Sequence, residues 1–134
     1  MEITVNHTSD IALFLIKGKI GWEKAQKLEE KIIQSLERGC TYIVFNLDEV
    51  TFLGSGGIGA LVYHMKKVHS RGGDIFIVSS SEYIQYLFAT IGFNLIFEGK
   101  IFATFDQLVE KVLDPKGLTL NFDGDKTTPV ETTD

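Results

Sequence analysis

The chain has 134 residues, of which 44% are hydrophobic and 23% charged, a balance typical of one soluble globular domain. Its 13 basic and 18 acidic residues give a net charge of -5, which argues against a nucleic-acid partner. A single cysteine excludes an internal disulfide, and neither a signal peptide nor a long apolar stretch is visible, so we expect a cytoplasmic protein without membrane insertion.

The first forty residues predict a hairpin followed by a helix. Apolar and polar residues alternate over 2–6, the polar residues 8–10 indicate a turn, and residues 11–16 are almost all apolar. Apolar residues then recur at helical spacing over 22–36, and Gly39 ends this pattern.

The middle of the chain predicts a strand, a helix and a second strand. Residues 41–47 form a short β-branched apolar run typical of a central strand, and residues 74–78 form another. Between them, residues 58–68 have the apolar spacing of a helix. A strand, helix and strand in about 40 residues predict a right-handed parallel crossover, so the sheet is at least partly parallel.

Two further helices are expected after this crossover. Ser79 with Glu82 forms a capping-box pattern ahead of a helical pattern that ends at Gly92. Residues 94–97 are then expected to form a short edge strand.

The last helix closes the predicted domain. Thr104 with Gln107 repeats the capping-box pattern ahead of a helix over 105–113, and the residues beyond are polar. The sequence therefore predicts an α/β fold, with one domain over residues 1–113 that has a mixed β-sheet of four to five strands and about four helices. Residues 114–134 are expected to form a flexible C-terminal tail.

The most informative segment is glycine-rich and runs from Leu53 to Gly59, between a predicted strand and a predicted helix. The first N–H groups of a helix lack internal partners, which suits an oxygen ligand. Ser55 has the only side chain there that can cap the helix or accept a group. Two interpretations stay open for Ser55, a helix N-cap and a phosphorylation site. The helix dipole would tolerate a phosphate, whereas a partner packed on the same loop would be displaced.

Several segments together carry a family resemblance. Residues 44–61 hold an apolar strand, the glycine-rich junction and the following helix, and residues 71–73 and 87–97 supply later landmarks. They resemble the STAS-domain anti-sigma-factor antagonists, small bacterial proteins that bind an anti-sigma kinase and thereby free a sigma factor. The resemblance spans about residues 2–113. It implies a STAS-like fold, a bacterial anti-sigma factor and serine kinase as partner, and Ser55 as the phosphoacceptor.

The expected partner-binding loop surrounds this serine. Trp22 is a further candidate contact, although a role in the core or as a helix staple competes with it. The loop residues expected to contact the partner are Phe52, Leu53, Gly54, Gly56, Gly57 and Ile58.

Three glycines depart from the family pattern. The family usually has an acidic residue before the phosphoacceptor, a second Ser or Thr after it, and an aspartate just after the second strand. This chain has Gly54, Gly56 and Gly21 at those positions. The two missing carboxylates favour an alternative, a STAS adaptor that is not phosphorylated and belongs to a signalling scaffold or a transport complex.

A third hypothesis makes Ser55 the nucleophile of a hydrolase. The Gly-x-Ser-x-Gly elbow requires glycine where this chain has Leu53, and a P-loop requires a lysine, which does not occur between Glu49 and Lys66. We therefore expect no catalytic residues, no cofactor and no metal.

Overall fold

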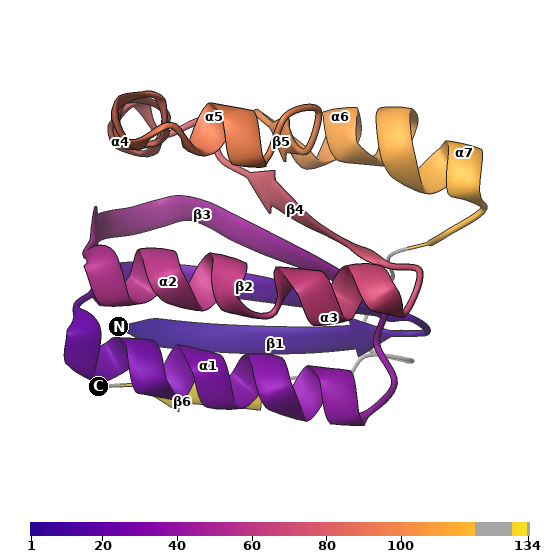
Figure 1. The fold of residues 1–134 in the computed structure, drawn as a ribbon, viewed down its shortest axis with the longest axis horizontal. Helices are drawn as coiled ribbons and strands as arrows, with labels where there is room; N and C mark the ends of the chain where they lie inside the picture. The colour runs from indigo at the N-terminus through magenta and orange to yellow at the C-terminus, as the bar shows by residue number, and fades with distance from the viewer. Residues whose placement is uncertain (120–129, 134) are drawn as a thin grey trace.

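The structure is a computed structural model that describes residues 1–119 and, by their backbone alone, 130–133 (Figure 1). The elements in chain order are β1 (Glu2–Thr8), β2 (Ile11–Ile20), α1 (Trp22–Glu37), β3 (Tyr42–Leu53), α2 (Ser55–Tyr63), α3 (Met65–Ser70), β4 (Asp74–Val78), α4 (Glu82–Ile91), α5 (Phe93–Ile96), β5 (Ile101–Phe102), α6 (Phe105–Leu108), the π-helical η1 (Val109–Leu113), α7 (Asp114–Lys116) and β6 (Val130–Thr133).

The strands form one mixed sheet in the order β5-β4-β3-β2-β1-β6. The pairs β2–β3, β3–β4 and β4–β5 are parallel, whereas β1 pairs antiparallel with β2 and with β6. Ser9, at φ 55°, turns the chain between β1 and β2. The predicted hairpin, parallel crossover and α/β class with a mixed sheet are confirmed.

Residues of the central strands point alternately to the two faces of the sheet. In β2, Ala12, Phe14 and Ile16 belong to one hydrophobic cluster, whereas Ile11 and Leu13 belong to another. Because both faces are covered, the central strands are continuous apolar runs in the sequence.

Helices cover the two faces unequally. The helices α1 to α5 pack on one face over the larger cluster, and α1, α2 and α3 lie in front of the sheet in Figure 1. The segment from α6 to η1 packs on the opposite face over the smaller cluster. The smaller cluster covers only part of that face. Its members from the strands are Ile11, Leu13, Val44, Phe76, Val78 and Phe102, and those from the helices are Leu108, Val112 and Leu113.

The expected edge strand over residues 94–97 is wrong. Gly92, at φ 81°, ends α4 in the left-handed region, and the chain then turns into the short helix α5. Phe93 and Phe97 are four residues apart, so a helical turn brings their rings together with centroids 5.3 Å apart and planes tilted by 60°, and Phe93 also packs against Phe88. The edge strand is β5 instead.

Two predicted helix details also differ. The helix expected over 58–68 is divided at His64 into α2 and α3. The cap of α4 is Ser81 rather than Ser79, because the Ser81 hydroxyl accepts from the Ile84 N–H at 3.3 Å.

The folded structure continues past the predicted boundary at Leu113. Residues 114–134, expected as a flexible tail, lie partly outside the described residues. Of those described, Asp114–Lys116 continue the last helix, and the Leu118 N–H donates to the Leu113 carbonyl at 2.8 Å. The backbone of Val130–Thr133 pairs with β1.

Candidate functional site

The glycine-rich junction lies where two parallel strands end side by side. Ile20 of β2 is in register with Leu53 of β3, and the Gly54 N–H donates to the Ile20 carbonyl at 2.9 Å. Each strand is followed at once by a helix, so α1 and α2 begin next to each other at the same edge of the sheet (Figure 1).

Two β-bulges determine which side chains reach the surface here. Relative to β2, β3 has one extra residue between Asn46 and Glu49 and another between Val50 and Phe52. Each bulge shifts the alternation of side chains by one residue. Phe52 is therefore turned outward and is 47% exposed. The inward residues of this segment are spaced by three: Leu47, Val50 and Leu53.

Ser55 is the first residue of α2, and its side chain is exposed. The N-cap is Gly54, in extended conformation and with no side-chain cap, so the interpretation of Ser55 as the N-cap is wrong. The Ile58 N–H makes the first helical bond, to the Gly54 carbonyl at 3.0 Å. The N–H groups of Ser55, Gly56 and Gly57 therefore have no partner within the helix.

Close packing explains two of the glycines that depart from the family pattern. A Cβ on Gly54 would lie 3.2 Å from the Phe52 ring, and one on Gly56 would lie 2.9 Å from Cα of Trp22. Both contacts are tighter than ordinary van der Waals distance, and the second is with backbone. Ser55 thus lies between Gly54, which packs against Phe52, and Gly56, which packs against Trp22.

Trp22 lies on the surface with 71% of its area exposed, so the alternative role in the core is wrong. Two other predicted loop residues point inward, since Leu53 is 3% exposed and Gly57 is buried against Leu53 and Ile20. Ile58 is half-buried against the larger cluster.

Tyr83 of α4 belongs to this site, although the sequence did not indicate it. Its hydroxyl accepts a hydrogen bond from the Leu53 N–H at 2.9 Å and so secures the last residue of β3. Further back on the same strand edge, the Asp48 carboxylate accepts from the Ser80 N–H at 2.6 Å. These long-range contacts hold the start of α4 beside the junction.

None of the three histidines is placed to activate Ser55. His64 ends α2 nine residues later, about 13 Å along the helix axis. His69 lies further on, in α3, and His7 hydrogen-bonds Ser35 at 2.9 Å in the second half of α1. The hydrolase hypothesis therefore lacks a histidine that could act as the general base of a triad.

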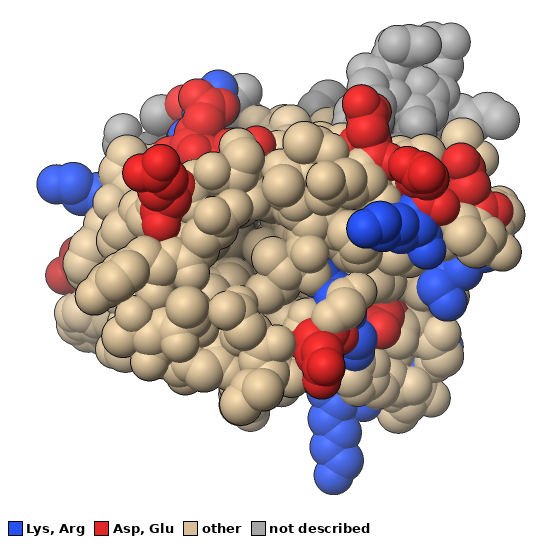
Figure 2. All heavy atoms as spheres, turned by 90° about the horizontal axis from the view of Figure 1, so that it is seen from above, with Lys and Arg blue, Asp and Glu red and all other residues tan. Residues whose placement is uncertain are grey.

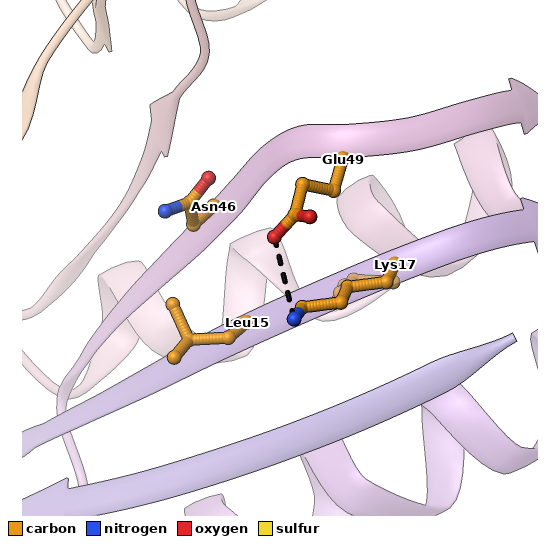
Figure 3. Close-up of a pocket in the computed structure, with 5 residues that line it drawn as sticks. Leu15, Lys17, Asn46 and Glu49 are labelled. Atoms are coloured by element: carbon orange, nitrogen blue, oxygen red, sulfur yellow. Dashed lines mark ion pairs between the residues drawn. The ribbon is translucent and has the colours of Figure 1, made fainter. Parts of the chain in front are cut away.

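A hollow of about 240 Å³ lies away from the junction, between β2 and β3. It is lined by Leu15, Ile16, Lys17, Asn46 and Glu49, and in Figure 3 Lys17 points toward Glu49, with an ion pair of 3.5 Å. This volume is below the range typical of ligand pockets, and both charged side chains are largely exposed. It contains none of the predicted site residues.

Two further searches concern the described part of the chain only. Within residues 1–119, no three histidine, cysteine, aspartate or glutamate side chains are grouped as metal ligands would be. No helix in this part has the length and apolar content needed to span a bilayer.

Comparisons with known proteins concern the domain as a whole rather than this site. The STAS domain family model matches residues 2–108. A Bordetella bronchiseptica protein named as a candidate anti-sigma factor antagonist, BtrV, is 19% identical over 97 residues, which are 72% of this chain and 84% of that protein.

Two solved structures share the fold. An anti-sigma factor antagonist from Mycobacterium paratuberculosis is 22% identical with a TM-score of 0.71, covering 84% of this chain and 94% of that one. The Bacillus cell fate determinant SpoIIAA in its phosphorylated form is 18% identical with a TM-score of 0.65, covering 82% and 98%.

Proposed function

The chain belongs to the STAS domain family, and from this premise we propose that it is an anti-sigma-factor antagonist whose partner binding is switched by phosphorylation of Ser55. In the unmodified state it would bind an anti-sigma kinase in the cytoplasm and free a sigma factor. Its relatives named as anti-sigma factor antagonists support this role. The role requires binding and acceptance of a phosphate, and no catalytic residue of its own.

The observation that carries the proposal is the exposed Ser55 hydroxyl at the start of α2. A kinase can reach this hydroxyl without unfolding the domain. The phosphate would lie next to free N–H groups at the helix start, where the dipole stabilises an anion by roughly 0.3–1 kcal/mol. The domain would therefore keep its stability after modification.

The same phosphate would act strongly on a bound partner. It carries about -1.5 to -2 charges at neutral pH and retains a hydration shell. A partner packed over Ser55 would have to desolvate that charge, which weakens binding unless it offers a cation. One local modification would thus change affinity while leaving the fold intact.

Phosphate transfer tests the proposal directly. The purified chain is incubated with its anti-sigma kinase and ATP, and its intact mass is measured. We expect the mass of one phosphoryl group to be added to wild type and not to Ser55→Ala. Ser70→Ala is the control, because Ser70 is also an exposed helical serine but lies at the end of α3, away from the junction, and it should be modified as wild type is.

The alternative is a constitutive STAS adaptor in a signalling scaffold or transport complex, favoured by the glycines at positions 21 and 54. A carboxylate is absent from the N-cap of α1 and from that of α2. If the kinase binds the chain without phosphorylating it, the result would favour this adaptor role over the phosphoswitch.

A further inference from the structure

The exposed aromatic side chains are unevenly distributed over the molecule. Within the described residues, five aromatic side chains are exposed, and four of them lie near the junction, on α1, on β3 and in the first half of α4. The fifth, Tyr63, lies at the opposite end of α2. The four near the junction are Trp22 (71% exposed), Phe52 (47%), Tyr83 (37%) and Tyr86 (74%).

Contacts with the junction place three of these residues around it. Phe52 lies against Gly54 and Trp22 against Gly56, so they flank Ser55 on its two sides. The Tyr83 hydroxyl reaches the Leu53 N–H. Tyr86 is three residues after Tyr83 and therefore lies on the same side of α4 one turn later.

The chain segments that carry Phe52, Tyr83 and Tyr86 are nearly free of charge. Residues 50–65 and 75–97 together contain one charged residue, Glu82, where the average of the chain would give about nine. Figure 2 looks onto α4 to α7. A broad uncharged area occupies the middle and lower left of the view, charged side chains gather toward α7, and others stand along the left and upper-left rim. The exposed apolar residues of α4 and α5 in addition to the tyrosines are Ile91, Leu95 and Ile96.

Charged residues lie beside these rings, and Glu82, one helical turn before Tyr86, lies among them on α4. Lys19 is paired with Phe52 across the sheet, and Glu23 and Lys24 follow Trp22 in the first turn of α1. The two positions where carboxylates are expected from the family are glycines with no side chain. The charged residues next to the rings are two basic and two acidic ones, so they offer a partner no surface of a single sign.

We propose that Trp22, Phe52, Tyr83 and Tyr86 form one aromatic contact surface by which the chain holds an apolar face of the anti-sigma factor. This inference rests on the proposed function and defines the chemistry of its interface. Aromatic residues in the centre of an interface supply most of its binding energy, and an apolar contact is insensitive to salt. A phosphate on Ser55 would then stand between Phe52 and Trp22, in the middle of the apolar contact.

The test has an arm that needs no partner. Nile red, a neutral dye that brightens on apolar surfaces, is titrated onto wild type, Trp22→Ala, Phe52→Ala and the control Tyr63→Ala. We expect the dye signal to fall by about half or more in the first two variants and to be kept in the third, with unchanged melting temperatures. Equal dye binding by all four proteins would overturn the aromatic surface.

The second arm uses the purified anti-sigma kinase. We expect Trp22→Ala and Phe52→Ala each to weaken its binding about tenfold, and Tyr63→Ala less than about threefold. Between about 0.05 and 0.5 M NaCl the affinity of wild type should change less than about threefold. A steep loss with salt, with both alanine variants binding normally, would overturn the inference. The expected dye pattern with no kinase binding by wild type would instead refute the proposed function and leave the aromatic surface standing.

Discussion

Glycines occur at both ends of the parallel strands, but they serve different purposes there. At the amino end of β4, a Cβ on Gly73 would overlap the carbonyl oxygen of Thr41, and that oxygen already accepts from the Asp74 N–H at 3.1 Å. At the carboxyl ends of β2 and β3 the contacts are looser: a Cβ would lie 3.2 Å from the Phe52 ring at Gly54 and 2.9 Å from Cα of Trp22 at Gly56, and at Gly59 of α2 it would have nothing within 4 Å.

The polar groups of the two ends differ in the same way. Asp74 is bound by Lys100 and His69, each at 2.9 Å, and Arg71 donates to the Leu36 carbonyl at 2.8 Å. At the junction, by contrast, free helix N–H groups and exposed rings surround an exposed serine. The amino end is therefore built for stability, whereas the carboxyl end keeps groups available for a partner.

The largest effect is expected for Gly73→Ala. The new methyl would collide with backbone that cannot move without breaking the pairing of β3 with β4. We therefore expect the free energy of unfolding to fall by at least about 3 kcal/mol, or the chain not to fold. Urea unfolding followed by circular dichroism measures this. A stability within about 1 kcal/mol of wild type would show that the two ends do not differ as described.

A smaller loss is expected for Gly57→Ala. The methyl would lie 2.6 Å from Cδ1 of Leu53 and 2.7 Å from Cγ2 of Ile20. Side chains can move more readily than backbone, so overpacking should cost about 1–3 kcal/mol in the same unfolding assay. A loss as large as that of Gly73→Ala would contradict the ranking.

Acid should lower the free energy of unfolding through Asp74, at the amino end of β4. Partial burial alone would raise the pKa of the Asp74 carboxyl, but hydrogen bonds from Lys100, His69 and the Ile75 N–H hold that pKa below its usual range. A depressed pKa in the folded state stabilises the fold above the unfolded pKa of about 3.9, and this contribution is lost as pH falls through the folded pKa. Asp74→Asn should therefore show a smaller loss of stability between about pH 5 and pH 2 than wild type. An identical pH dependence in the two proteins would count against this role for Asp74.

The smallest effect, a gain, is expected for Gly59→Ala. Alanine is favoured over glycine inside a helix by about 0.5–1 kcal/mol, and the position has open space.

Ser55→Asp should keep the thermal midpoint within a few degrees of wild type, because an acidic group suits the helix start. A large drop for Ser55→Asp, measured by calorimetry, would mean that this serine supports the fold.

Local patterns predicted most of the fold because they depend on burial. The alternation in β1, the helical spacing after Trp22 and the apolar runs of β3 and β4 follow directly from which faces are covered. The run over 94–97 was misassigned because Phe93 and Phe97 pack together only once the left-handed Gly92 has turned the chain. Periodicity over four residues cannot distinguish a strand from a helical turn.

The site was predicted less completely. The glycine-rich junction and Ser55 are visible in the sequence because glycines and a serine mark a strand-to-helix turn. The two bulges that turn Phe52 outward and Leu53 inward depend on the register with β2, which no local pattern carries. Tyr83 is 30 residues from Leu53, so only the folded chain brings them together.

The central claim is that the junction binds a partner and that Ser55 switches this binding. Titration calorimetry of the anti-sigma kinase against unmodified chain and against chain phosphorylated at Ser55 tests it most directly. We expect the phosphorylated chain to bind at least about tenfold more weakly, about 1.4 kcal/mol, while Ser55→Ala binds as the unmodified chain does. Equal or tighter binding by the phosphorylated chain would contradict the switch.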